Sequence, residues 1–98
     1  ALYVGGMGAK SRNFHNELIK RMGFEEAAEK IQDLFLAGRK DEATLAVPTE
    51  LADEVSLVGS VDRIRDRLQA WKETPVTSLL VSTRNVDQLR TFAELVLG

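Results

Sequence analysis

Three glycines followed by a lysine and a serine stand near the start of the sequence. The stretch YVGGMGAKS runs from an apolar segment through Gly5, Gly6 and Gly8 to Lys10 and Ser11, ahead of a predicted helix. This order is typical of a nucleotide phosphate-binding loop, whose backbone N–H groups surround the phosphates while the lysine reaches the terminal ones. The first question is whether the stretch binds a nucleotide.

The spacing argues against a phosphate-binding loop. Such a loop needs a glycine, four further residues, and then Gly-Lys-Ser or Gly-Lys-Thr. Here Ala9 precedes Lys10, and Gly5 lies one residue too close. The three-glycine dinucleotide pattern also fails, because its third position falls on Ser11. We therefore interpret the glycines as marks of close backbone packing or of an interrupted helix, since clustered glycines are costly in a helix without such a reason.

Composition excludes several other kinds of site. The 98 residues are 44% hydrophobic and 29% charged, as in one small globular domain. Thirteen Lys and Arg against fifteen Asp and Glu give a net charge of −2, which argues against nucleic acid or an acidic membrane as partner. Without cysteine, and with His15 as the one histidine, we expect no thiol chemistry and no metal site. No apolar run approaches the roughly 20 residues of a membrane span and no signal peptide is visible, so we expect a cytoplasmic protein.

Helices dominate the predicted secondary structure. The clearest covers residues 24–38, where apolar residues recur at three- and four-residue spacing and Gly38 stands where a left-handed helix end belongs. Ser60 is a good N-cap for a second clear helix, whose expected buried stripe is Val61, Ile64, Leu68 and Trp71. The predicted helices are 11–22, 24–38, 39–47, 48–55, 61–73 and 86–97.

One segment, residues 76–83, is predicted as a clear strand. Leu79, Leu80 and Val81 are consecutive, so both faces of this strand are apolar, which is typical of a parallel sheet covered on both sides. At most one more strand is indicated, at 55–58. A parallel sheet of one or two strands leaves its edges unpaired. Together with a start at Ala1 inside an apolar run, this predicts the end of an α/β protein whose other strands lie upstream.

Several stretches of the sequence resemble a known family. YVGGMG, NFHNEL, IQDLFLAGRKDEA and the LVGS block before the predicted strand are similar to the C-terminal part of luciferase-like oxidoreductases, and most similar to the actinobacterial branch that depends on the deazaflavin coenzyme F420. The resemblance spans nearly the whole chain. It implies an α/β fold, the C-terminal part of a (β/α)8 barrel that takes about 250 residues.

In that fold the 98 residues are one partial domain. Residues 1–55 form a helical excursion, and residues 56–98 form the last helix–strand–helix units, with the final barrel strand at 76–83. The pattern of ALYVGGMG alone allows a strand, but the resemblance favours a helix there, and we expect the helix.

The resemblance also indicates where a ligand lies. Active sites of such barrels are at the C-terminal ends of the strands, which implies that Ser82, Thr83 and Arg84 face the barrel mouth. The Arg84 guanidinium matches a carboxylate or phosphate, although a surface ion pair is the commoner fate of a lone arginine.

The glycine-rich stretch forms a wall or lid near the same mouth in this interpretation. Lys10, Phe14 and His15 are then candidates for contact with the substrate or the coenzyme tail. The alternative for His15 is a structural hydrogen-bonded role, and packing is the expected role of Trp71.

The implied activity is hydride transfer between coenzyme F420 and an organic substrate. FMN is the alternative cofactor, because luciferase-like barrels use both. The resemblance implies that residues earlier in the barrel hold the cofactor, so this sequence identifies no catalytic residue and we expect the isolated chain to be inactive. The expected partners are a small-molecule substrate and further copies of the same chain. Two other classes stay open: a non-catalytic helical interaction module and, less favoured, a nucleotide-binding protein.

Overall fold

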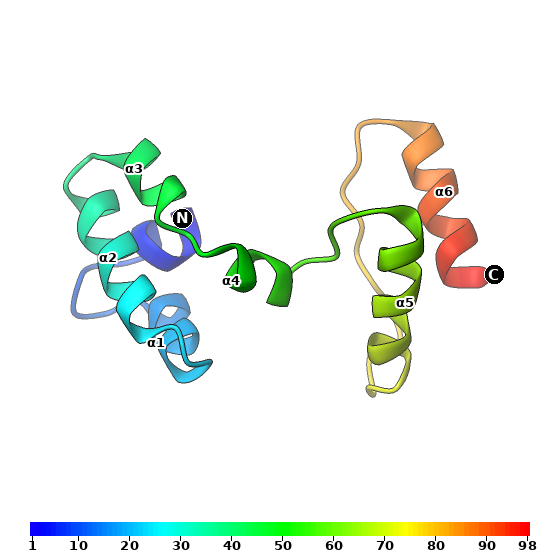
Figure 1. Cartoon of the computed structure of the whole chain (residues 1–98), viewed down its shortest axis with the longest axis horizontal. Helices are drawn as coiled ribbons and strands as arrows, with labels where there is room; N and C mark the ends of the chain where they lie inside the picture. The colour runs from blue at the N-terminus through cyan, green and yellow to red at the C-terminus, as the bar shows by residue number, and fades with distance from the viewer. The chain divides into compact units, whose positions relative to one another are not determined.

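The computed structural model describes all residues from Ala1 to Gly98, and every regular element in it is a helix (Figure 1). The chain divides into two compact units, Ala1–Val55 and Ser56–Gly98. No helix combines the length and the apolar character needed to cross a membrane. The first unit contains the π-helical turn η1 (Leu2–Gly6), α1 (Phe14–Arg21), α2 (Glu25–Leu36), α3 (Lys40–Leu45) and α4 (Thr49–Glu54), and the second contains α5 (Val61–Lys72) and α6 (Val86–Leu97).

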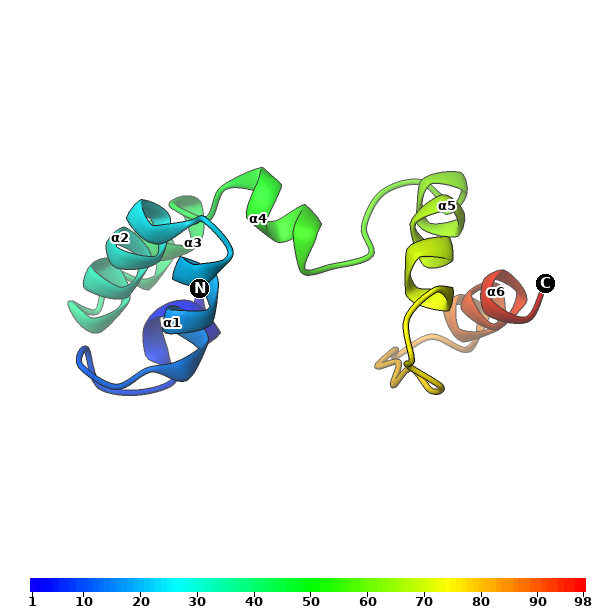
Figure 2. The ribbon, with the colours of Figure 1, turned by 90° about the horizontal axis from the view of Figure 1, so that it is seen from below.

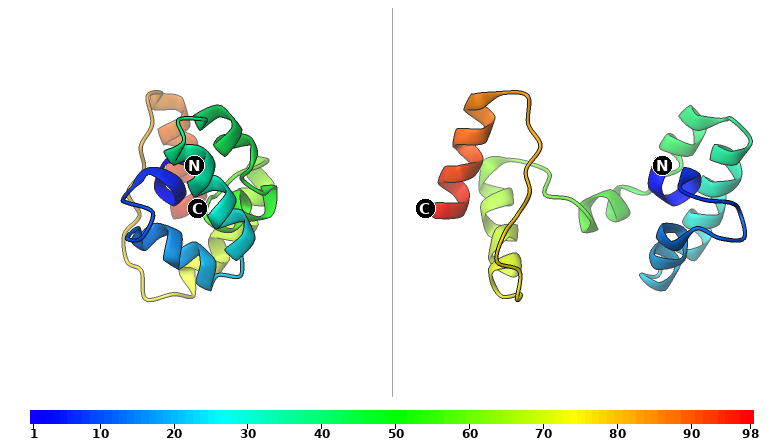
Figure 3. Two further views of the ribbon diagram at one scale, coloured as in Figure 1. Left: turned by 90° about the vertical axis from the view of Figure 1, so that its left-hand side faces the viewer. Right: turned by 180° about the vertical axis from the view of Figure 1, so that it is seen from behind.

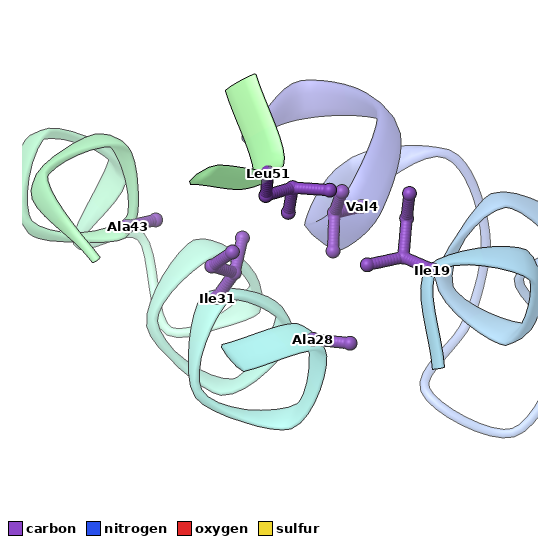
Figure 4. Packing of buried hydrophobic residues seen from close by; sticks show 6 residues of the cluster. All are labelled: Val4, Ile19, Ala28, Ile31, Ala43 and Leu51. Carbon is purple, nitrogen blue, oxygen red and sulfur yellow. The ribbon is translucent and has the colours of Figure 1, made fainter. Parts of the chain in front are cut away.

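Helix α2 is the centre of the first unit and contacts η1, α1 and α3. Its predicted apolar face is confirmed, because Ala28 and Ile31 are fully buried. Full burial of an isoleucine side chain such as that of Ile31 stabilises a fold by about 1.5–3 kcal/mol relative to leaving it exposed. The other elements of the unit each add one apolar side chain to this core (Figure 4): Val4, Ile19, Ala43 and Leu51.

Hydrogen bonds from caps fix where several helices begin and end. Asn13 Oδ1 accepts a hydrogen bond from the backbone N–H of Asn16 at 3.0 Å, and so begins α1. The predicted N-cap of α5 is confirmed, since Ser60 Oγ accepts from the Arg63 N–H at 3.2 Å. The predicted left-handed end of α2 is also confirmed, with Gly38 at φ +81°.

The structure confirms both expectations for the glycine-rich stretch, a helical turn and close packing. A Cβ atom on Gly5 would lie 2.6 Å from Cβ of Phe35, and one on Gly6 would lie 2.9 Å from Cδ1 of the same ring. Real Cβ atoms do not approach neighbours this closely, so only glycine lets η1 lie against α2. The Lys40 ammonium lies over the same Phe35 ring, 5.4 Å from the ring centre.

The second unit consists of α5, an extended segment and α6. The segment runs back along α5 before α6 begins (Figure 3). Leu68 and Leu95 are the buried hydrophobic residues of this unit. The predicted buried stripe of α5 is therefore only partly right. Leu68 is buried, but Val61 and Trp71 are 47% and 43% exposed.

The predicted strand at 76–83 is wrong as a secondary-structure element. These residues are extended but drawn as plain coil (Figure 2), and no backbone–backbone hydrogen bond is made by residues 75–84. The second candidate strand, at 55–58, is also absent. The physical reason is that a strand is defined by a ladder to a neighbouring strand, and no other extended segment of this chain pairs with residues 76–83.

Candidate functional site

The predicted site residues fall into both units, with Lys10, Phe14 and His15 in the first and Ser82, Thr83 and Arg84 in the second. In the first unit, the glycine-rich loop (residues 7–12) follows η1 and precedes Asn13. Lys10 lies at its tip and forms an ion pair with Asp33 of α2. The backbone carbonyl of Lys10 accepts a hydrogen bond from Gln32 Nε2 at 3.3 Å. The lysine that was predicted to contact a ligand is thus held by two consecutive residues of α2.

The other two predicted residues of this unit open α1. Phe14 is 77% exposed, so most of its ring faces solvent. The imidazole of His15 packs edge-on against the Tyr3 ring, with the ring centres 5.1 Å apart and the planes at 76°. Tyr3 is itself more than half exposed. Lys10 pairs with α2 while His15 pairs with η1, so the structure shows no shared contact between the two residues.

Three buried amide side chains hold this region together, and the sequence interpretation did not assign them. Asn16 Nδ2 donates to the carbonyl oxygens of Val4 and Ala28, both at 2.9 Å. Asn13 Nδ2 donates to Val4 O at 3.2 Å. The third buried amide is that of Gln32. Asn13, Asn16 and Gln32 are each at most 3% exposed. The available signal was the i, i+3 asparagine pair in NFHNEL, in which the first residue is an N-cap.

In the second unit, Ser82, Thr83 and Arg84 lie at the end of the extended segment. Thr83 Oγ1 accepts a hydrogen bond from the Asn85 N–H at 3.1 Å. The same hydroxyl donates to Gln88 Oε1, also at 3.1 Å. It therefore stabilises the start of α6, and its position at a barrel mouth stays a prediction. Ser82 and Arg84 are exposed, and their side chains form no hydrogen bond or ion pair in this chain.

A groove of about 440 Å³ lies on the second unit between α5, the extended segment and α6. Its lining is mainly apolar and includes Leu68, Trp71, Leu79, Val81 and Phe92. None of the six predicted site residues lines this groove.

Few polar side chains of the chain lie where they could bind a metal ion or a cofactor. No group of three or more His, Asp or Glu residues is placed to hold a metal ion. The groove has Lys72, Thr77 and Ser78 as its polar lining, and no buried charged or amide group points into it. A deazaflavin or flavin needs hydrogen-bond partners for its polar ring atoms and its tail, so the residues present do not by themselves form a cofactor site.

Family membership follows from comparison with known proteins. Residues 1–78 match the model of the luciferase-like monooxygenase family, and the chain belongs to this family. The resemblance noted in the sequence is thereby confirmed.

A relative from Mycobacterium tuberculosis (strain ATCC 25618 / H37Rv) carries the name "Putative coenzyme F420-dependent oxidoreductase Rv3520c". It is 41% identical over 96 residues, which are 98% of this chain and 28% of the relative. The chain thus spans little more than a quarter of that protein's length. No solved structure matches the chain.

Proposed function

We propose that this chain is the C-terminal part of a luciferase-like oxidoreductase that transfers a hydride between coenzyme F420 and an organic substrate. The observation that carries the proposal is the 41% identity, over 98% of this chain, to a protein named for dependence on that coenzyme. When bound, the deazaflavin supplies the hydride chemistry. The substrate is predicted to be a small molecule. The predicted partners are further copies of the same chain, and the predicted location is the cytoplasm.

The chain's own contribution in this proposal is structural. The family implies a (β/α)8 barrel, in which the extended residues 76–83 become the last strand and α6 the last helix. Two features support this assignment. The backbone of residues 75–84 makes no backbone–backbone hydrogen bond, and Leu80 is fully exposed opposite a groove lined by Leu79 and Val81. The face that carries Leu80 and both edges of the segment are thus available to the rest of a barrel, while the other face lines the groove beside α5 and α6.

The isolated chain is inactive in this proposal, because it forms no cofactor site of its own. A binding experiment tests both parts. A protein of the relative's length that carries this sequence is titrated with F420 and with FMN, and the 98-residue chain is titrated in parallel. Binding of F420 by the longer protein alone is expected. Binding of FMN but not F420 would show an FMN-dependent monooxygenase instead, and binding of F420 by the 98-residue chain would contradict its inactivity.

A second candidate is a non-catalytic helical interaction module. The observation that favours it is the first unit, which has its own apolar core and leaves no buried side-chain polar atom without a hydrogen bond. This alternative predicts a monomeric 98-residue chain with cooperative thermal unfolding. Size-exclusion chromatography that shows higher oligomers favours the barrel interpretation, since the unpaired segment then finds a partner in another copy.

A further inference from the structure

The base of the glycine-rich loop is fixed by buried hydrogen bonds. Asn13, which ends the loop, is 3% exposed. Its Nδ2 donates to Tyr3 O at 3.3 Å and to Val4 O at 3.2 Å, on the turn that precedes the loop. Because these bonds join the two ends of the loop away from water, the ends stay together when the tip moves.

The tip of the loop closes on itself. The Arg12 N–H donates to Ala9 O at 2.9 Å, and the two residues form an isolated antiparallel bridge. Gly8 permits this turn, since a Cβ atom there would lie 3.2 Å from the carbonyl carbon of Arg12 and still closer to its oxygen. Residues 7–12 are all exposed. The tip is therefore a small closed unit on a fixed base.

Lys10 makes both polar contacts between this tip and α2. Its carbonyl oxygen accepts from Gln32 Nε2 at 3.3 Å, and its ammonium pairs with the Asp33 carboxylate. The Gln32 side chain is buried, whereas the side chains of the ion pair are 69% and 56% exposed. An ion pair this exposed is weakened by salt and by competing ions.

We propose that residues 7–12 form a strap that closes on α2 through Lys10 and lifts when the Lys10–Asp33 pair is broken. Lifting releases the ammonium and the carbonyl of Lys10 together and exposes the Gln32 carboxamide to water. The inference concerns this chain alone and does not depend on the proposed oxidoreductase activity.

Trypsin cleavage at the Lys10–Ser11 bond tests the strap directly. Trypsin must bind the Lys10 ammonium in its specificity pocket and attack the Lys10 carbonyl. These are the two groups that Asp33 and Gln32 hold. The initial rate of release of residues 1–10 from the 98-residue chain, measured by mass spectrometry relative to a peptide of residues 7–13, therefore reports the lifted state.

The variant Asp33→Asn keeps the shape of the side chain and removes its charge. At low salt it is expected to raise cleavage at Lys10 by about 1.5- to 5-fold, the range that the strength of an exposed ion pair allows. Added sodium chloride should bring the wild-type rate toward that of the variant. The matched control is Glu29→Gln on the same helix, which breaks the 3.8 Å Lys20–Glu29 pair without touching the strap and should leave the rate at Lys10 unchanged.

Two outcomes overturn the proposal. One is equal cleavage at Lys10 in the wild type, the variant and the control. The other is a variant in which cleavage at Lys20 and Lys30 rises as much as at Lys10, which indicates unfolding of α1 and α2 rather than lifting of the strap. NMR gives an independent readout. Exchange of the Gln32 side-chain amide protons with water should be faster in Asp33→Asn than in the control, and unchanged exchange contradicts the strap.

Discussion

The side-chain amide of Asn16 lies 2.9 Å from the carbonyl oxygen of Val4 and donates to it a hydrogen bond buried from water. Its second proton goes to the carbonyl of Ala28 at the same distance. One side chain of α1 thus joins η1 to α2. These two hydrogen bonds also give buried backbone carbonyl groups of η1 and α2 a donor away from water.

Replacing Asn16 with alanine is expected to lower the free energy of unfolding of the first unit by about 1–3 kcal/mol, because two buried carbonyl groups each lose the hydrogen bond from this side chain. Urea denaturation followed by circular dichroism measures the change. The control is Glu17→Gln, one residue further along α1, where an exposed carboxylate 3.7 Å from Lys20 is neutralised. It should cost less than about 1 kcal/mol. Equal losses of unfolding free energy in the two variants would show that the buried amide hydrogen bonds contribute no more to stability than the exposed ion pair.

The packing of Gly6 against Phe35 makes a second prediction. Gly6→Ala should destabilise the first unit by about 1–3 kcal/mol through overpacking, since the new methyl group meets the Phe35 ring. The double variant Gly6→Ala, Phe35→Leu should recover part of this loss, because the smaller side chain makes room. A double-mutant cycle measures the coupling between the two positions, and additive effects would refute the contact.

The ion pair of Arg39 and Glu42 at the start of α3 predicts a pH dependence. Arg39 Nη2 donates to Glu42 Oε1 at 2.6 Å, and this hydrogen bond lowers the pKa of Glu42 below its usual value of 4.5. A carboxyl group whose pKa is lowered by folding contributes stability above its unfolded pKa, and this stability is lost as the pH falls through the folded pKa. The wild type should therefore exceed Glu42→Gln in stability near neutral pH, and this difference should shrink as the pH falls below 4.5, as urea midpoints measured over that range would show. A difference that persists in acid contradicts this assignment.

The fully exposed Leu80 separates the two proposed contexts of the chain. In the 98-residue chain, Leu80→Ser should change the free energy of unfolding by less than about 0.5 kcal/mol, because the side chain is entirely exposed. In a barrel protein that covers this face, removal of a buried leucine side chain should cost about 2–5 kcal/mol. Thermal unfolding of both proteins compares the two values, and a neutral effect in the longer protein would place this face outside the barrel core.

Helix positions were predictable from the sequence because local signals set them. The Ser60 cap, the Gly38 end and the apolar face of α2 each depend on residues within a few positions along the chain. The strand at 76–83 was not predictable in this way. Its apolar pattern is correct for a covered strand, but pairing depends on other strands, and this chain supplies none.

The contacts that the candidate site residues make within this chain were less predictable, for a related reason. The resemblance singled out Lys10 as a ligand contact, while its ion pair with Asp33 joins residues 23 positions apart and has no local signature. Thr83 was predicted at a barrel mouth, yet within this chain its hydroxyl stabilises the start of α6. The packing role of the glycines was foreseen because their number within a short stretch required it, but their contact with the Phe35 ring was not.

The extended segment also affects how the molecule behaves in concentrated solution. Residues 76–83 carry no charge and no proline, are rich in β-branched and aliphatic side chains, and present an unpaired backbone. Short stretches of this composition stack into the cross-β arrangement of amyloid when nothing covers them. The nearest charged residues, Glu73 and Arg84, flank the segment and act as gatekeepers against such stacking. The strand-forming capacity that a barrel would use is therefore, in the 98-residue chain, a tendency toward fibrils that Pro75 and the flanking charges oppose.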